Sequence, residues 1–163
     1  MSHPQRRPLA LDYATDNCTI GRAMEILGER WTLLVIREVF NGVRKFDDMR
    51  RHTGVPRQVL TNRLALLVEH GVLRREPYRV DGQRERHEYR LTDKGFALVP
   101  VLVALAEWGN RYLADTEGPP IELVHRDCGS VVTEHVRCSR CHEITEPRDI
   151  VGRPGPGVRR VPT

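Results

Sequence analysis

The amino-acid sequence predicts an α+β fold that is mainly α-helical. Over most of residues 16–115, apolar side chains recur every three or four positions, which is the period of an amphipathic helix. Strand-like segments joined by a tight Asp-Gly turn occur once, within residues 72–91. A chain of 163 residues is long enough for one core and a small extension, but not for two full domains.

The positive charge of the chain is concentrated in one region. The net charge is +4, yet residues 44–90 hold twelve Lys or Arg against seven Asp or Glu. Such a local excess suggests a polyanionic partner, although a solvated surface would show the same composition.

Nothing in the sequence predicts contact with a membrane. No run approaches the eighteen or so apolar residues that a membrane span needs, and residues 1–14 lack the apolar core of a signal peptide. The expected location is therefore the cytoplasm.

Residues 18–42 predict two helices separated at Gly28-Glu29 and ended by a cap at Gly42. The preceding residues 1–15 predict a flexible N-terminal arm. The first helix is expected to bury three apolar residues, Ile20, Met24 and Leu27. The second helix is expected to bury a larger apolar set, namely Trp31, Leu34, Val35, Val39 and Phe40.

Residues 45–69 predict two short helices joined by a tight turn at Gly54-Val55-Pro56. Asp47 and Asp48 begin the first helix, where the helix dipole favours carboxylates, and this role is expected rather than acid–base catalysis. The second helix, over about 56–69, carries one apolar stripe and one polar face. The stripe consists of Leu60, Leu64, Leu67 and Val68, and the polar face of Arg57, Gln58, Thr61 and Asn62.

Residues 72–91 predict a β-hairpin whose strands, 72–80 and 84–91, meet at Asp81-Gly82. Because Pro77 has no backbone N–H, its strand is expected at an edge or with a bulge. Thr92 is then expected to cap a long helix, in which Pro100 predicts a kink or an early first turn.

Two short helices followed by a basic hairpin form the pattern of a winged helix-turn-helix. In that arrangement the second helix enters the DNA major groove, where Arg suits guanine, Gln or Asn suits adenine, and Thr makes small contacts. The candidate base-reading residues are Arg57, Gln58, Thr61 and Asn62. The candidate contacts to backbone phosphates beside the first helix are Arg44, Lys45, Arg50 and Arg51. In the wing over 72–91, the candidate contacts to phosphates or an adjacent minor groove are Arg79, Arg84 and Arg86.

The combined features predict a sequence-specific DNA-binding transcriptional regulator, acting as a repressor on double-stranded operator DNA. The alternative is a winged-helix protein-interaction module that does not read DNA sequence. An enzyme is not predicted, because the chain has neither a phosphate-binding loop nor a Gly-x-Ser-x-Gly elbow.

Three segments of the chain carry a resemblance to a known family: Cys18 followed by "GERWTLLVIREVFNG", then "KFDDMRRHTGVPRQVLTNRLALLVEHGVLRREPY", then "HEYRLTDKGFALVPVLVALAEWGNRY". The most specific combination is Trp31, Leu60-x-x-Arg63-Leu64 and Glu88-Tyr89-x-Leu91-Thr92-x-x-Gly95. Over about residues 16–115 the chain resembles HxlR-type winged-helix regulators of the MarR-like group.

This resemblance implies a homodimer, paired through N-terminal and C-terminal helices, on operators with two-fold symmetry. It also implies that Arg63 contacts the DNA backbone or braces the wing. Where many members have a Ser at the start of the recognition helix, this chain has Pro56, so a hydroxyl contact does not carry over.

The apolar content of residues 98–113 agrees with a dimer, although a fully buried core helix would show the same pattern. The apolar residues in this segment are Leu98, Val99, Val101, Leu102, Val103, Leu105, Trp108 and Leu113.

The C-terminal part of the chain carries a pattern typical of zinc binding. His125-x2-Cys128 and Cys138-x2-Cys141 form two close pairs, which predict a structural zinc ion in a zinc-ribbon-like extension. His135 and His142 are substitute ligands, and the alternative is a small extension with reduced, unligated thiols. The expected domains are an arm (1–15), the winged domain with dimerisation helices (16–117), this extension (118–150) and a disordered tail (151–163).

Cys18 lies near the start of the first predicted helix, with Arg22 one turn further on. Both features favour a thiolate. In some HxlR-type regulators the cysteine at this position senses oxidants or electrophiles, so Cys18 is a candidate redox sensor. The competing interpretation is a small buried hydrophobic residue. The signal is thus expected to be an oxidant or a small molecule, and no residue pattern identifies the latter.

Overall fold

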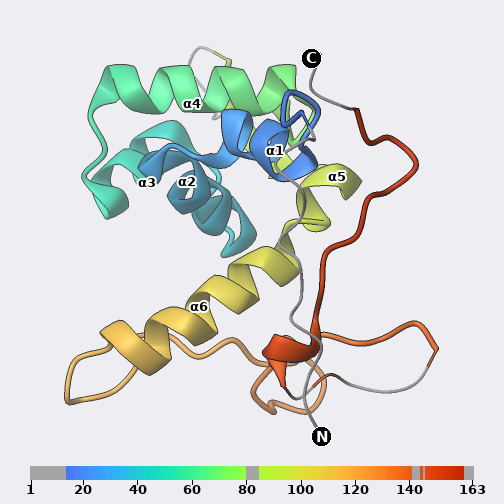
Figure 1. Cartoon of the computed structure of the whole chain (residues 1–163). Coiled ribbons are helices and arrows are strands. Elements are labelled where there is room, and N and C mark those ends of the chain that lie inside the picture. Colours follow the sequence, from blue (N-terminus) through green and yellow to red (C-terminus); the bar gives the residue numbers. More distant parts are fainter. Residues whose placement is uncertain (1–13, 80–84, 141–143, 145, 160–163) are drawn as a thin grey trace, which may run out of the picture. The chain divides into compact units, whose positions relative to one another are not determined.

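The structure, a computed structural model, describes residues 14–79, 85–140, 144 and 146–159 (Figure 1). In this part, helices predominate and one two-stranded antiparallel sheet is present. The elements are α1 (Thr19–Leu27), α2 (Arg30–Phe40), α3 (Phe46–Thr53), α4 (Arg57–Glu69), β1 (Leu73–Tyr78), β2 (Arg86–Leu91), α5 (Asp93–Phe96), α6 (Val99–Leu113) and the short 3-10 helix η1 (Pro147–Asp149).

The chain divides into two compact units. Residues Ile26–Glu134 form one unit, and the described residues of 1–25 and 135–163 form the other. In the latter, the amide of Ala14 donates to the carbonyl of Arg159, and Asp16 pairs with the Arg159 guanidinium. No helix of the described chain is long and apolar enough to cross a lipid bilayer.

The turn between α3 and α4 follows from one glycine. Gly54 has φ +71, a conformation that residues with a Cβ rarely adopt, and its amide donates to the carbonyl of Arg50 at 2.9 Å. Two residues later, Pro56 occupies the N-cap position of α4 rather than the first helical position, with no side-chain cap. The helix-turn-helix therefore begins and ends where the sequence predicts, within one residue.

Helices α2, α3 and α4 pack around a common apolar core. Its most deeply buried side chains, each with at most 1% of its surface exposed, include Ile36, Met49, Leu60, Leu64 and Leu67. Full burial of each such side chain is worth about 1.5–3 kcal/mol. The apolar stripe predicted for α4 is thus confirmed for its three leucines, while Val68 is only partly buried.

The buried face of α2 differs from the predicted one. Val35 and Val39 are buried as expected, but Ile36 and Glu38 are also fully buried. The large residues expected in the core are only partly buried at its margin, and these are Trp31, Leu34 and Phe40. Since α2 lies against α3, α4 and β2 on one side and α6 on another, apolar spacing alone does not identify its most buried side.

Glu38 places a carboxylate inside this core. Its Oε1 accepts hydrogen bonds from Arg37 Nε at 3.0 Å and Arg37 Nη2 at 2.6 Å. Its Oε2 contacts Nδ1 of His52, which belongs to α3. Both oxygens therefore have partners, as a buried carboxylate requires, and the second contact ties α2 to α3.

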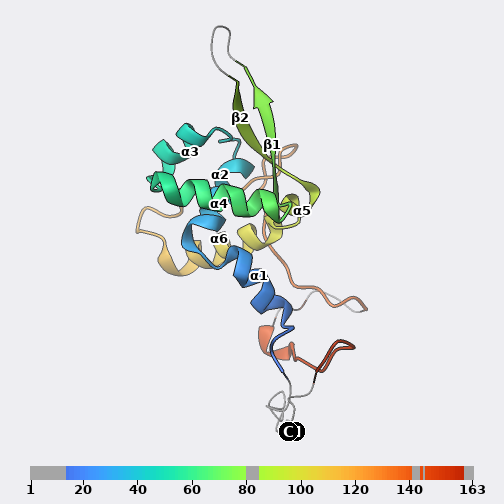
Figure 2. The same ribbon diagram turned by 90° about the horizontal axis from the view of Figure 1, so that it is seen from above.

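The wing is an antiparallel pair in which Leu73 lies opposite Leu91 and Tyr78 opposite Arg86. On the other edge of β2, Lys45 forms a bridge with Glu88. β1 is therefore the outer strand among the described residues, which confirms the edge position expected from Pro77. The two strands extend beyond the helices (Figure 2). The Asp81-Gly82 turn lies outside the described residues.

The predicted long helix after Thr92 is two helices, α5 and α6. Thr92 caps α5 by accepting a hydrogen bond from the Gly95 amide, and its hydroxyl also donates to the carbonyl of Gly71 at 2.6 Å. Pro100 lies within the first two positions of α6. A proline at this position needs no N–H partner, so the early first turn that it predicted is confirmed.

The prediction that α1 buries Ile20 and Met24 is wrong. The exposed fractions of these residues are 74% and 52%, and no residue of α1 is fully buried. Leu27, at the end of α1, does pack partly against the core. The apolar residues of α1 therefore form a surface of the isolated chain, because periodicity shows that one face is apolar but not what covers it.

We expect Gly95→Ala to destabilise the fold, because a Cβ at this position would lie 2.3 Å from the Val72 carbonyl oxygen. Such overpacking lowers the free energy of unfolding by about 1–3 kcal/mol. Gly109→Ala in α6 is the matched control. A Cβ there meets nothing within 4 Å, and the change should raise stability by about 0.5–1 kcal/mol. Urea unfolding followed by circular dichroism measures both, and equal effects of the two variants would contradict the close approach.

Candidate nucleic-acid interface

The exposed face of α4 carries the four predicted base-reading residues. Arg57, Gln58, Thr61 and Asn62 are all exposed. Gln58 Nε2 donates to Asn62 Oδ1 at 2.9 Å, and the Thr61 hydroxyl donates to the carbonyl of Arg57 at 3.0 Å. The first of these bonds leaves Gln58 Oε1 as an acceptor and Asn62 Nδ2 as a donor. Adenine presents the complementary pair, an N6 donor and an N7 acceptor, in the major groove.

A polar hollow of about 510 Å³ lies between the start of α3, the start of α4 and the wing. It brings together three of the predicted residues: Lys45 just before α3, Arg57 of α4 and Arg86 of β2. Aromatic rings position two of these cations. Lys45 Nζ lies 4.7 Å from the centroid of Tyr78, and Arg57 Cζ lies 5.3 Å from that of Phe46.

The hollow is basic but not uniformly so. Asp47 and Asp48 also line it, and Asp48 forms an ion pair with Arg51 of the same helix. Arg51 is therefore partly neutralised, whereas Arg50 is exposed on α3 and Arg63 is half-buried in α4. Arg84 lies outside the described residues.

Several arginines of the wing are paired within the wing itself. Glu76 binds Arg74 and Arg90, and Arg79 pairs with Glu85 at 3.2 Å. The hydrogen bond from Arg74 is the main cause that lowers the pKa of Glu76; desolvation opposes it, and the charge of Arg90 adds to it. Glu76 therefore stays ionised at neutral pH and holds Arg74 and Arg90. Of the predicted wing contacts, Arg79 is paired, and its partner is Glu85.

Sequence reasoning missed Arg75. This exposed side chain lines the basic hollow and also a second hollow of about 440 Å³ between α4 and the wing. Its neighbour Arg74 is held by Glu76, two positions along the same strand. Because successive residues of a strand point to opposite faces, this alternation is the signal that could have separated Arg75 from Arg74.

His125 and Cys128 come together in a tight turn closed by the bridge between Val124 and Val131. The Cys128 Sγ lies 3.4 Å from His125 Nδ1. Two ligands of a tetrahedral zinc ion, one S at 2.3 Å and one N at about 2.05 Å, lie about 3.5 Å apart, so these two residues fit adjacent positions on one ion. Hydrogen bonds from the side chain and backbone of Ser130 lower the pKa of the Cys128 thiol.

The second pair of predicted zinc ligands is only partly within the described residues. Cys138 is half-buried in the other unit of the chain, and Cys141 and His142 lie outside the described residues. Within the described part, no three His, Cys, Asp or Glu residues form a group that could hold a metal ion.

Cys18 directly precedes α1 and is exposed. Its carbonyl accepts the amide of Arg22 at 2.9 Å, as in a first helical turn. The alternative of a small buried hydrophobic residue is therefore wrong for the isolated chain.

Comparison with known proteins decides the family. The family model described as HxlR-like helix-turn-helix matches residues 26–117, which hold α2 to α6 and the wing. The chain belongs to this family. Family membership confirms the predicted class of transcriptional regulator and, with it, that the HxlR-like chain is not an enzyme.

Relatives and solved structures agree with this assignment. The HTH-type transcriptional regulator Rv3095 of Mycobacterium tuberculosis, itself uncharacterised, is 45% identical over 149 residues, which cover 91% of this chain and 93% of the relative. The crystal structure of PA1607, a candidate transcription factor, is 34% identical with a TM-score of 0.73, over 85% of this chain and 96% of that one. The redox regulator HypR in its reduced form is 26% identical with a TM-score of 0.50, over 58% of this chain and 94% of that one.

Proposed function

We propose that this HxlR-like protein is a homodimeric repressor that reads its operator with α4 in the major groove. The wing would contact the neighbouring backbone or minor groove. The observation that carries the proposal is the position of the acceptor–donor pair of Gln58 and Asn62 on the exposed face of α4, beside the basic hollow. The former supplies sequence readout and the latter a site for phosphates.

The basic hollow supports backbone binding through its arrangement. Lys45 lies over the ring of Tyr78 from the wing, and Arg57 over that of Phe46 at the start of α3. Arg75 and Arg86 approach the same hollow from the wing. Cations from two sides of one hollow suit the phosphates that flank a groove. Arg50 and Arg63 extend the basic surface along α3 and α4.

A homodimer would cover an apolar stripe on α6. Val101, Leu105, Trp108 and Tyr112 are spaced by four, three and four residues, and their exposed fractions run from 43% to 59%. This is the a/d spacing by which two helices pack against each other. A second copy of α6 is the partner with matching spacing, and the exposed Ile20 and Met24 of α1 add further apolar surface. Two-fold pairing would present two copies of α4 to successive major grooves.

The alternative is a protein-interaction module that uses the same winged helix without reading DNA sequence. Repression, rather than activation, is supported only by analogy with regulators that occlude promoters. A DNA titration separates the regulator from the interaction module. Only a protein that recognises DNA sequence binds a selected site more tightly than scrambled DNA, and that binding is steeply salt-dependent.

We expect Gln58→Ala and Asn62→Ala each to weaken the binding free energy for a DNA site selected from random duplexes by about 1–3 kcal/mol. Each variant should also no longer distinguish the bases at one base pair of that site. Lys45→Ala and Arg86→Ala should instead weaken binding to all sequences and reduce the slope of log K against log salt by about one each. Fluorescence anisotropy at several salt concentrations measures both. Equal binding of selected and scrambled DNA by the wild type would contradict sequence-specific recognition.

Trp108→Glu should convert the dimer to a monomer, because it places a charge in the centre of the apolar stripe on α6. Sedimentation velocity measures the mass. The affinity of the variant for an operator with two half-sites should fall, and its circular dichroism spectrum should stay that of the wild type. Ala114→Glu, just beyond the end of α6, is the control and should leave the mass unchanged. A wild-type monomer at micromolar concentration would rule out this assembly.

We also infer that His125, Cys128, Cys138 and Cys141 hold a structural zinc ion, supported by the 3.4 Å spacing of the first pair and the Cys-x2-Cys spacing of the second. Protein purified without added metal should contain about one zinc per chain by mass spectrometry. Cys128→Ser and Cys138→Ser should each lose most of it, whereas Cys18→Ser should keep it. Zinc-free wild type would leave the alternative of reduced, unligated thiols.

Oxidant sensing by Cys18 stays a prediction, supported by its exposure and by the redox regulator HypR among the structural relatives. Peroxide should reduce the operator affinity of the wild type but not of Cys18→Ser. Dithiothreitol added after the peroxide should restore the wild-type affinity, which serves as the control. An unchanged peroxide response in Cys18→Ser would assign the effect to another residue.

A further inference from the structure

Three consecutive carbonyl groups at the C-terminal end of α4 are held by the segment that leads from the wing to α6. The ammonium of Lys94 donates to the carbonyl of His70 at 2.7 Å. The hydroxyl of Thr92 donates to the carbonyl of Gly71 at 2.6 Å, and the amide of Thr92 donates to that of Val72 at 3.1 Å. We call these three hydrogen bonds, donated by Thr92 and Lys94, the α4 clamp.

The turn that ends α4 makes these carbonyls available. Gly71 has φ +66, and in this turn the amides of Gly71 and Val72 donate back to the carbonyls of Val68 and Leu67, at 3.0 and 2.8 Å. These bonds satisfy the last turn of the helix, so the next carbonyls along the chain can accept donors from another segment. The positive charge of Lys94 also suits the negative end of the helix dipole.

The α4 clamp ties α4 to the start of α6. Thr92 caps α5 and Lys94 belongs to it. The amide of Leu98, the N-cap of α6, donates to the carbonyl of Gly95 at 3.1 Å, so α5 leads into α6 through continuous helical hydrogen bonds. Gly95 also approaches Val72 so closely that a Cβ would lie 2.3 Å from its carbonyl oxygen. A short, closely packed joint therefore connects the two helices.

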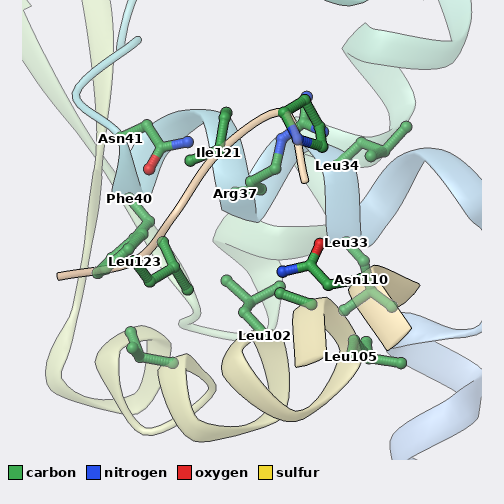
Figure 3. A pocket seen from close by; sticks show the side chains of 13 residues that line it. Leu33, Leu34, Arg37, Phe40, Asn41, Leu102, Leu105, Asn110, Ile121 and Leu123 are labelled. Atoms are coloured by element: carbon green, nitrogen blue, oxygen red, sulfur yellow. The ribbon is translucent and has the colours of Figure 1, made fainter. Parts of the chain in front are cut away.

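The packing of α6 against α2 is less complete than this joint. A pocket of about 330 Å³ lies between α2, α6 and residues 120–123 (Figure 3). Its lining includes Leu33 and Arg37 of α2 and Leu102 of α6. Because a pocket intervenes, α2 constrains the middle of α6 less than a filled core would. The α4 clamp thus has a large share in fixing the angle between α4 and α6.

We propose that Thr92 and Lys94 are positioning residues that determine which spacing of DNA half-sites the dimer accepts. This inference rests on the homodimeric reading of an operator proposed above. In a dimer paired through α6, the separation and tilt of the two copies of α4 depend on the angle between α4 and α6 in each chain. The α4 clamp holds that angle, so both copies of α4 enter successive major grooves only at one spacing.

Half-site spacing is a sensitive measure of this angle. Each base pair inserted between the half-sites rotates one of them by about 34–36° and moves it by about 3.4 Å along the duplex. A rigid dimer then no longer contacts both half-sites at once, and it loses the gain in affinity that comes from two-site binding. A dimer in which α4 can tilt tolerates the same shift with a smaller loss.

The test changes Lys94 to Met, which removes the donor and the charge but keeps an unbranched side chain. Lys94 is exposed, so we expect the variant to fold, and circular dichroism checks this. Fluorescence anisotropy measures the affinity for duplexes that carry the selected half-site twice, at the selected spacing and at spacings one base pair longer and shorter. The wild type should prefer the selected spacing by on the order of tenfold, and Lys94→Met by about twofold or less.

Three controls separate positioning from a general loss of binding. Lys94→Arg, which keeps a donor and the charge, should retain the wild-type preference for one spacing. Arg153→Met removes one exposed positive charge elsewhere in the chain and should also retain it. On a duplex with a single half-site, Lys94→Met should bind as tightly as the wild type, because no second half-site has to be matched.

Two results would overturn the inference. One is an unchanged spacing preference in Lys94→Met. The other is a loss of affinity by the same factor at every spacing, which is the result expected of a merely structural lysine. Failure of the proposed function looks different, because the wild type itself would then show no preference for the selected half-site or for one spacing, and the inference would fall with it.

Discussion

The buried carboxylate of Glu38 is the constraint on which the arrangement of the helices depends. A charge in the core is tolerated only while its partners stay in place, and removing one partner typically costs about 3–5 kcal/mol. Glu38 has one partner beside it on α2 and one on α3, so it fixes these two helices relative to each other. Met49 of α3 and Leu60 of α4 share the core with Ile36, so α4 packs against the two helices that this contact joins.

Strand geometry, rather than total charge, decides which cations of the wing are available to a polyanion. On one side of the hairpin Glu76 holds both Arg74 and Arg90 in ion pairs that also stiffen the strands. Arg75 belongs to the opposite side and lines the two hollows next to α4. A basic sequence of the same composition with its acidic residues shifted by one position would present a different surface, because the alternation along a strand has a period of two.

Local signals predicted most of the fold and the exposed face of α4. Turn and cap chemistry acts within a few residues, which explains why Gly54, Thr92 and Pro100 mark element boundaries correctly. Features that depend on distant packing were not predictable in the same way. Spacing shows that α1 has an apolar face but not that Ile20 stays exposed, and no local pattern brings Arg37 to a pocket walled by three segments. The predicted zinc ligands combine a local and a distant feature. Sequence spacing groups them into two close pairs, but only tertiary packing could bring the two pairs to one ion.

Pro77 has a consequence for how copies of this protein can crowd together. The outer strand of a two-stranded sheet offers unpaired backbone groups to any other strand, and such edges promote aggregation. Here that strand carries a residue with no N–H and, along the same stretch, the charged side chains of Arg74, Arg75 and Glu76. A second hairpin cannot extend the ladder past the proline. Molecules bound side by side would therefore keep their wings separate instead of fusing them into a continuous sheet.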